Sequence, residues 1–166
     1  MLRIAGAVIG AALQFLSLPA HSAAGSSTAA LKVLSLDLLS VTSGGAIVLD
    51  SSAADAATGV VGPVSDSAAR LNYTQNSALN KKITAQVTAN PGGSDITLSV
   101  SVAGGAGPQT LVSGGVTSAA QNVYTNIAAG ALSNRAVTYT AQATAAGTKV
   151  SATTDFVFTV TFTSTN

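Results

Sequence analysis

Several short segments of the sequence alternate apolar and small polar residues one by one, and this alternation limits the fold more than any other feature. It is clearest in KKITAQVTA (81–89), ITLSVSV (96–102), AVTYTAQAT (136–144) and FVFTVTFT (156–163). Successive side chains of a β-strand point to opposite faces, so a two-residue period predicts strands with one buried face. The segments between them are rich in Gly, Pro, Asn and Ser, which favour turns. The pattern therefore predicts an all-β chain.

The apolar positions of these segments identify the expected core. NPGGSD (90–95) is expected to turn the first two segments into a hairpin, and AAGTK (145–149) the last two into a second one. Three phenyl rings in the last segment are expected to supply much of the bulk of the core. The predicted inward residues of the four strands are Ile83, Ala85, Val87, Ala89, Ile96, Leu98, Val100, Val102, Val137, Tyr139, Ala141, Ala143, Phe156, Phe158, Val160 and Phe162.

Weaker signals complete the expected fold. Further strands are predicted at 31–41, 46–49, 68–74, 110–112 and 122–127. A long loop, with one short edge strand as an alternative within it, is predicted at 50–67, where Gly and Pro interrupt small polar residues. The nearly continuous apolar character of ALKVLSLDLLSV (30–41) indicates a strand buried on both faces or carrying a bulge, with a short helix as the alternative. About seven to nine short antiparallel strands predict an immunoglobulin-like two-sheet β-sandwich, with a closed barrel as the structural alternative.

The first residues, MLRIAGAVIGAALQFLSLPAHSAAG, have the pattern of a secretory signal peptide. Arg3 precedes an apolar run, Pro19 interrupts that run, and Ala20 and Ser22 offer the small residues of a cleavage site. The run is shorter than the ~20 residues that a membrane span needs. We therefore expect a signal peptide at 1–22, a single domain at 23–166, and no membrane span after cleavage. This predicts a secreted protein at the cell surface or outside the cell, reached through the periplasm in a Gram-negative organism.

Charge and composition narrow the range of partners. Charged residues make up 8% of the chain, against about 25% in ordinary soluble domains. Without residues 1–22, six basic residues balance six Asp, so the domain carries no net charge. A neutral domain has no electrostatic attraction to nucleic acid, and near-zero charge favours self-association. The chain has no Cys, so its stability must come from packing, backbone hydrogen bonds or neighbouring subunits.

The residue types beyond position 22 argue against catalysis. His21 falls within the predicted signal peptide, and 23–166 lacks His, Cys, Glu and Trp. The commonest general base, the thiolate nucleophile and the soft metal ligands are then missing, so we expect no enzyme, cofactor or metal site. Asp50, Asp55 and Asp66 match no calcium-loop spacing and are expected as solvated turn formers. Lys81 and Lys82 are likewise expected as solvated charges at a strand start.

Several features together resemble a known class of proteins: the signal peptide, the apolar segment LKVLSLDLLSV (31–41), the alternating Thr-, Ser- and Ala-rich strands and the terminal FVFTVTFT. The chain resembles the small secreted β-sandwich subunits of bacterial surface filaments, the pilin and fimbrial class that includes the spore-coat-U-like group. Subunits of that class are incomplete sandwiches, and an N-terminal strand of the next subunit fills the groove of each.

The resemblance implies a structural subunit of an extracellular filament, pilus-like fibre or matrix. Its expected partner is a second copy of the chain, with an assembly chaperone or a surface anchor as further partners. The donated strand would include, or follow, the residues Leu31, Val33, Leu34, Leu36, Leu38, Leu39 and Val41. The acceptor groove or core wall would include Phe156, Phe158, Val160 and Phe162.

The alternative function is a secreted or surface-attached adhesin or carbohydrate-binding β-sandwich module. Tyr73, Tyr124 and Tyr139 are the candidates for stacking on sugar rings. Tyr73 and Tyr139 lie in alternating strands, however, where packing within the sheet is the commoner use of such rings. Aromatic residues make up only 4% of the chain, and this scarcity favours the filament interpretation.

Overall fold

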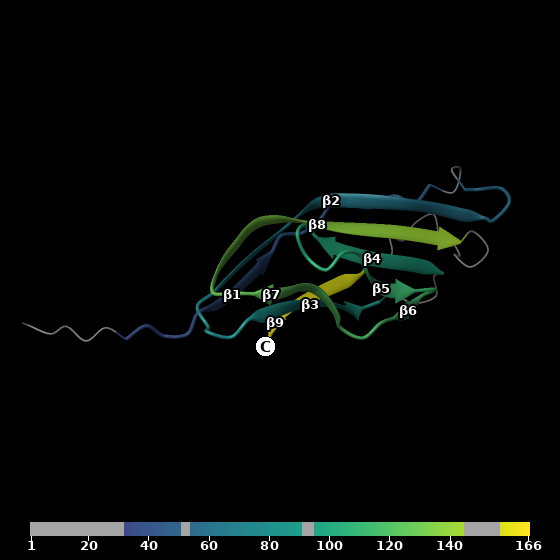
Figure 1. Cartoon of the computed structure of the whole chain (residues 1–166). Helices are drawn as coiled ribbons and strands as arrows, with labels where there is room; N and C mark the ends of the chain where they lie inside the picture. Colours follow the sequence, from purple (N-terminus) through teal and green to yellow (C-terminus); the bar gives the residue numbers. More distant parts are fainter. Residues whose placement is uncertain (1–31, 51–53, 91–94, 145–156) are drawn as a thin grey trace, which may run out of the picture. The chain divides into compact units, whose positions relative to one another are not determined.

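Two long antiparallel strands, β2 (Val60–Gln75) and β8 (Gly130–Thr144), lie side by side within the larger of two sheets (Figure 1). The computed structural model describes residues 32–50, 54–90, 95–144 and 157–166. The strands in these ranges all belong to one compact unit, Leu34–Asn166, and the ranges contain no helix. The prediction of an all-β chain is confirmed, whereas the predicted signal peptide lies outside the described residues.

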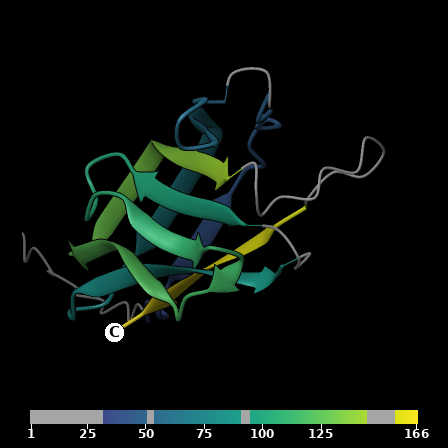
Figure 2. The ribbon, with the colours of Figure 1, turned by 90° about the vertical axis from the view of Figure 1, so that its right-hand side faces the viewer.

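The unit consists of two antiparallel sheets. The larger sheet has the order β1 (Asp37–Val41), β2, β8, β4 (Ile96–Val102), β5 (Gln109–Ser113) and β6 (Val116–Thr117). The smaller has the order β7 (Gln121–Ile127), β3 (Lys81–Ala89) and β9 (Thr159–Thr165). The larger sheet curls like half of a barrel (Figure 2), so that β1 contacts β9 on one side and β5 contacts β7 on the other.

The alternating segments form strands, although β9 covers Thr159–Thr165 rather than the predicted 156–163, and the two predicted hairpins are wrong. β3 pairs with β7 and β9, whereas β4 pairs with β5 and β8, so consecutive strands belong to opposite sheets. The same holds for β8 and β9. A strand with one apolar face buries that face equally well in a hairpin or across two stacked sheets. Alternation therefore fixes the buried face of a strand but leaves its pairing partner open.

The predicted loop at 50–67 is wrong in its second half. Residues from Val60 onward form the first part of β2, which pairs with β8 through three register shifts. One of these shifts lies at Gly62 and Pro63. Proline has no backbone N–H, and it is tolerated here because the regular hydrogen bonding between the two strands is interrupted at a register shift. Gly62 has a φ of 96°, and a Cβ there would lie 2.9 Å from the carbonyl oxygen of Ala141. The composition is typical of a loop, and pairing with a long neighbouring strand overrides it.

The apolar segment at 31–41 also differs from its prediction. It contributes only the five residues of β1, an edge strand with no buried residue, rather than a strand buried on both faces or a helix. Residues 46–49, predicted as a strand, have no regular secondary structure, although Ile47 and Leu49 pack against the core. The predicted strands at 68–74, 110–112 and 122–127 are confirmed within β2, β5 and β7.

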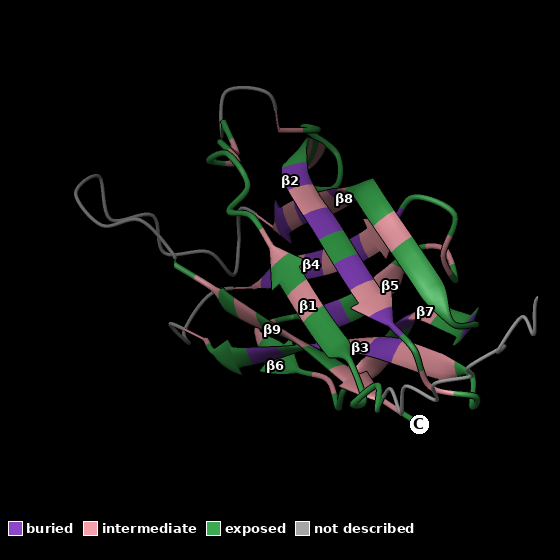
Figure 3. Cartoon of the chain, turned by 90° about the vertical axis from the view of Figure 1, so that its left-hand side faces the viewer, coloured by how far each residue is buried: buried purple, intermediate pink, exposed green. Residues whose placement is uncertain are grey.

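Small aliphatic side chains and one aromatic ring form the core (Figure 3). Of the predicted inward residues that the structure describes, Ala89 is exposed, and Tyr139, Phe158, Val160 and Phe162 are only half-buried. Phe156 lies outside the described residues. Of the three phenyl rings expected to supply much of the bulk of the core, Phe158 and Phe162 pack against it but are not fully buried. The buried residues are Val61, Ala69, Leu71, Tyr73, Gln75, Ile83, Ala85, Val87, Ile96, Leu98, Val100, Val102, Leu111, Val112, Val123, Ile127, Val137, Ala141 and Ala143.

Candidate assembly surface

The edge strands of the two sheets differ in how well they resist a further strand. On one side, β6 has only two residues, and β7 contains Asn126 with a φ of 57° and pairs irregularly with β3. Short and irregular edges discourage pairing with another strand. On the other side, β1 pairs with β2 without a register shift, and β9 pairs with β3 in continuous register from Val160 to Thr165. Neither β1 nor β9 contains a proline or a lysine.

We call β1, β9 and the adjacent Phe158 the open flank. Among the described residues, no strand pairs with the outer side of β1 or with the outer side of β9. Figure 3 shows only exposed and half-buried residues along both strands. Seven residues of β9 correspond to roughly 23 Å of strand edge. The open flank therefore offers unpaired backbone on both sheets on the same side of the unit.

Apolar side chains lie half-buried beneath these edges. Phe158, Val160 and Phe162 pack against the core from the β9 side, and Leu39 and Val41 pack against it from β1. Each remains partly accessible, in contrast to the fully covered residues of the central strands. A strand added beside β9 would bond to its backbone and cover these side chains.

The predicted donor residues fall into three groups. Leu31 lies outside the described residues. Val33, Leu34 and Leu36 precede β1 and are 73%, 71% and 38% exposed. The remaining three belong to β1 and pair with residues of β2 in the same chain, namely Leu38 with Thr74, Leu39 with Tyr73 and Val41 with Leu71. Of the predicted acceptor residues, Phe158, Val160 and Phe162 lie together on the open flank, and Phe156 is outside the described residues.

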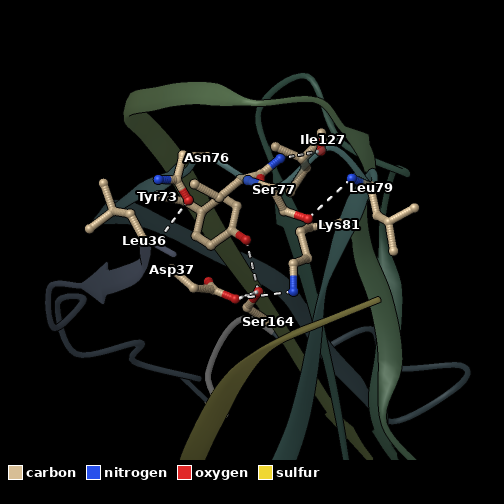
Figure 4. A network of polar contacts seen from close by, with 10 residues as sticks. Leu36, Asp37, Tyr73, Asn76, Ser77, Leu79, Lys81, Ile127 and Ser164 are labelled. Atoms are coloured by element: carbon tan, nitrogen blue, oxygen red, sulfur yellow. Dashed lines mark hydrogen bonds and ion pairs between the residues drawn. The ribbon is translucent and has the colours of Figure 1, made fainter. Parts of the chain in front are cut away.

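A polar cluster joins the two sheets at one end of the open flank (Figure 4). It consists of Asp37 on β1, Tyr73 on β2, Lys81 on β3 and Ser164 on β9. The Ser164 hydroxyl donates to Asp37 Oδ2 over 3.2 Å and lies 2.9 Å from the Tyr73 hydroxyl. Lys81 Nζ lies 3.4 Å from the same carboxylate oxygen. The polar cluster thus holds Asp37, the first residue of β1, against Ser164 near the end of β9.

The ionisation of the polar cluster follows from these contacts. Partial desolvation acts to raise the pKa of Asp37, but the hydrogen-bonding groups of Tyr73, Ser164 and Lys81, with the charge of Lys81, outweigh it. The pKa of Asp37 is therefore lowered. Burial, followed by the nearby carboxylate, raises the pKa of Tyr73. Asp37 is thus held as a carboxylate and Tyr73 as a neutral phenol at neutral pH.

Asn76, directly after β2, binds the chain just before β1. Its side-chain oxygen accepts from the Leu36 N–H over 2.6 Å, and its side-chain nitrogen donates to the Leu34 carbonyl over 2.8 Å. Its own backbone N–H donates to the Leu36 carbonyl over 3.2 Å. The Asn76 amide therefore takes the place of a neighbouring backbone and extends the pairing of β1 by two residues. Figure 4 shows Leu36, Asn76 and the polar cluster at the same end of the unit.

The sequence prediction missed both Asn76 and the polar cluster. Lys81 was expected as a solvated charge, but its side chain is only 16% exposed and pairs with Asp37, so that expectation is wrong. The four cluster residues come from four strands, and no spacing pattern links them. One signal was present: Asp37 is the single acidic residue in the apolar segment at 31–41. A charge retained in an apolar segment usually has a partner.

The aspartates at 50, 55 and 66 do not form a shared site in the described structure. Asp55 accepts from the backbone N–H groups of Ala57 and Thr58 within its own turn, and these contacts lower its pKa. Asp66 accepts from the Gly45 N–H over 2.8 Å. Within the described ranges, no three His, Cys, Asp or Glu side chains gather as metal ligands would.

The described part of the chain has no helix with the length and apolar character of a membrane span. No protein-family model, curated protein or solved structure matches the chain. The functional interpretation therefore rests on the geometry of the open flank.

Proposed function

We propose that this protein is a structural subunit of an extracellular filament, and that the subunits polymerise by strand donation. The observation that carries the proposal is the outer edge of β9, which no described strand covers and beneath which Phe158, Val160 and Phe162 are only half-buried. An added strand bonds to a row of backbone groups and covers alternate side chains. A contact made head to tail does not close on itself and therefore produces a fibre.

The strand order supports a finer description of the fold as an immunoglobulin-like sandwich that lacks one strand. In the constant-type arrangement, strands A, B, E and D form one sheet and C, F and G the other. The order β1-β2-β8-β4 corresponds to A-B-E-D, and β3-β9 corresponds to C-F. The strands from β5 to β7 would then be an insertion between D and E. The position of G falls on the outer edge of β9, where the described chain places no strand.

The donor in this proposal is the segment before β1. Residues 37–41 pair with β2 in the same chain, so the segment free for donation narrows to the residues before Leu34. After removal of the proposed signal peptide, this segment is AAGSSTAALKV (23–33), which has Lys32 as its only charged residue and carries Leu31 and Val33 at alternate positions. Each large apolar side chain that becomes fully buried contributes about 1.5–3 kcal/mol. Burial of two donor residues and of the remaining exposed area of three acceptor residues would add to the backbone hydrogen bonds of the donated strand.

Composition supports the same proposal. Near-zero net charge removes the repulsion that keeps subunits apart. The absence of cysteine means that a durable fibre would depend on packing and backbone hydrogen bonds. Export through a signal peptide cleaved after Ser22 would deliver the subunit to the cell surface. Mass spectrometry of the purified protein should then find Ala23 as the first residue.

Assembly of the secreted chain tests the proposal directly. We expect the purified protein, residues 23–166, to form fibres visible by electron microscopy and large species in light scattering. A variant in which Leu31 and Val33 are both changed to Ser should assemble far more slowly. A matched control changes two exposed apolar residues outside the proposed contact, Val48 and Val116, to Ser. Equal assembly of the two variants, or a wild-type protein that stays monomeric at high concentration, would contradict the proposal.

A further inference from the structure

The way in which the chain enters β1 bears on the source of the donated strand. Leu34 and Leu36 are bound by the Asn76 amide, and the next residue, Asp37, is held by the polar cluster. The backbone at Leu34 and Leu36 and the side chain of Asp37 are thus bound where the chain leads into β1. Because Asp37 lies against Ser164, near the end of β9, a chain that continues backward in this line passes beyond β9.

A segment on this path reaches β9 of its own chain only if it reverses direction. Tight reversals depend mainly on Gly, Pro, Asn, Asp and Ser. Residues 28–34, TAALKVL, contain none of these types, and the nearest such residues are Gly25, Ser26 and Ser27. A turn at these residues would leave at most four residues of the proposed mature chain before it, too few to cover the seven residues of β9.

We infer that Asn76 and the polar cluster direct the N-terminal segment away from β9 of its own chain, so that the open flank receives the segment of a second copy. This inference rests on the proposed function and adds the reason that donation is intermolecular. Asn76 acts as a positioning residue, since its amide binds the backbone before β1 and forms no hydrogen bond with the described residues of β9. Loss of its side chain would remove two of the bonds that fix the direction of the segment.

The test introduces a turn into the N-terminal segment and then removes the Asn76 hydrogen bonds that hold this segment. A K32N/V33G variant of the chain 23–166 introduces Asn-Gly, the strongest short signal for a tight hairpin turn. To this background we add either Asn76→Ala or the matched change Asn72→Ala. Asn72 also lies at the end of β2, and its side chain accepts from the Asn134 N–H over 2.9 Å rather than binding the N-terminal segment. Both additions thus remove side-chain hydrogen bonds near the same end of β2.

The measurement is hydrogen exchange of the β9 amides in the dilute monomer, with light scattering of the wild-type chain at high concentration as a separate readout. With Asn76→Ala we expect roughly tenfold or greater protection of the outward β9 amides in the monomer. The background variant and its Asn72→Ala derivative should keep β9 unprotected in the monomer. Equal β9 protection in the two derivatives, or protected β9 amides in the wild-type monomer, would overturn the inference.

The two readouts separate this inference from the proposed function. A wild-type protein that never assembles contradicts the filament proposal. Exchange in the monomer does not depend on assembly, so the effect of Asn76→Ala on β9 is still measured in that case. Conversely, a wild-type protein that forms fibres while both derivatives exchange alike at β9 leaves the filament proposal intact and removes the role of Asn76.

Discussion

The two flanks of this sandwich are closed to very different degrees. On the closed flank, formed by β5, β6, β7 and the loop at 103–108, Leu111, Val112 and Val123 are 0% exposed. The loop bonds directly to the facing sheet, since the Ala106 N–H donates to the Val123 carbonyl over 3.1 Å. On the open flank, neither β1 nor β9 has a buried residue, and the polar cluster joins the sheets at one end.

The difference comes from what faces each strand rather than from the strand itself. β7 (QNVYTNI) and β9 (TVTFTST) are both seven residues long, uncharged and flanked on one side by β3. β5 contacts β7, and Val123 of β7 is fully buried, whereas β1 contacts β9 without burying any of its residues. Two edge strands of one sheet thus differ in burial because the larger sheet covers one more completely than the other.

The largest expected contrast is between one apolar residue from each flank. Leu111→Ala should destabilise the monomer by about 3 kcal/mol, because it opens a cavity in a fully buried site. Phe162→Ala should cost less, about 1–2 kcal/mol in the monomer, although the side chain is larger, because its ring is only partly buried. Urea denaturation of dilute monomer measures both values. A cost for Phe162→Ala equal to that for Leu111→Ala would show that the open flank is closed in solution.

The next contrast lies within the loop of the closed flank. A Cβ on Gly105 would lie 2.1 Å from the Val123 carbonyl oxygen, so Gly105→Ala must push the loop away from β7. We expect a loss of about 2–3 kcal/mol. Gly107→Ala is the matched control, because its Cβ would meet nothing within 4 Å and only its φ of 86° carries a cost, about 1 kcal/mol. Thermal unfolding of both variants checks the order, and a smaller loss for Gly105→Ala would contradict the closed geometry.

Alternation predicted the strands and their buried faces well. The bounds of β3 and β4 were predicted to the residue, and the inward positions of β4 are all buried. The pairing partner of each strand was not predictable, because the alternation in its sequence shows only that one face is apolar. The loop-like sequence of 60–67 became part of β2 because pairing with β8 outweighs local preference.

The candidate site was predicted in part. Phe158, Val160 and Phe162 were identified as one face of a strand, but their alternation could not show that this face would be only half covered. Burial at that position depends on how far the larger sheet curls, which is a property of all six of its strands. Asn76 and the polar cluster were missed for a similar reason. Their contacts join residues far apart in the sequence, such as Asp37 and Ser164, and arise only when the two sheets meet.

A smaller effect is expected from the polar cluster. Because the pKa of Asp37 is lowered by folding, its contribution to stability is present above the pKa of the unfolded chain and is lost as the pH falls through the folded pKa. Asp37→Asn should cost about 1 kcal/mol or less at pH 7, since the Asp37 side chain is 39% exposed and solvent screens the ion pair. The difference between wild type and variant should shrink as the pH is lowered toward 3. A pH-independent difference would show that the charge of Asp37 does not hold the flank.

The smallest expected effect concerns the last residue of β9. The Thr165 hydroxyl is buried and finds no hydrogen-bond partner among the described residues. Thr165→Val keeps the shape of the side chain and removes this unsatisfied group, so the monomer should become more stable by about 0.5 kcal/mol. Denaturation of dilute monomer measures this gain, and light scattering of the same variant compares its assembly with wild type. A stabilised monomer that assembles normally shows that the hydroxyl has no role between subunits. A variant that assembles poorly instead shows that the donated strand supplies the missing partner, which would place the junction at the same end of β9 as the polar cluster.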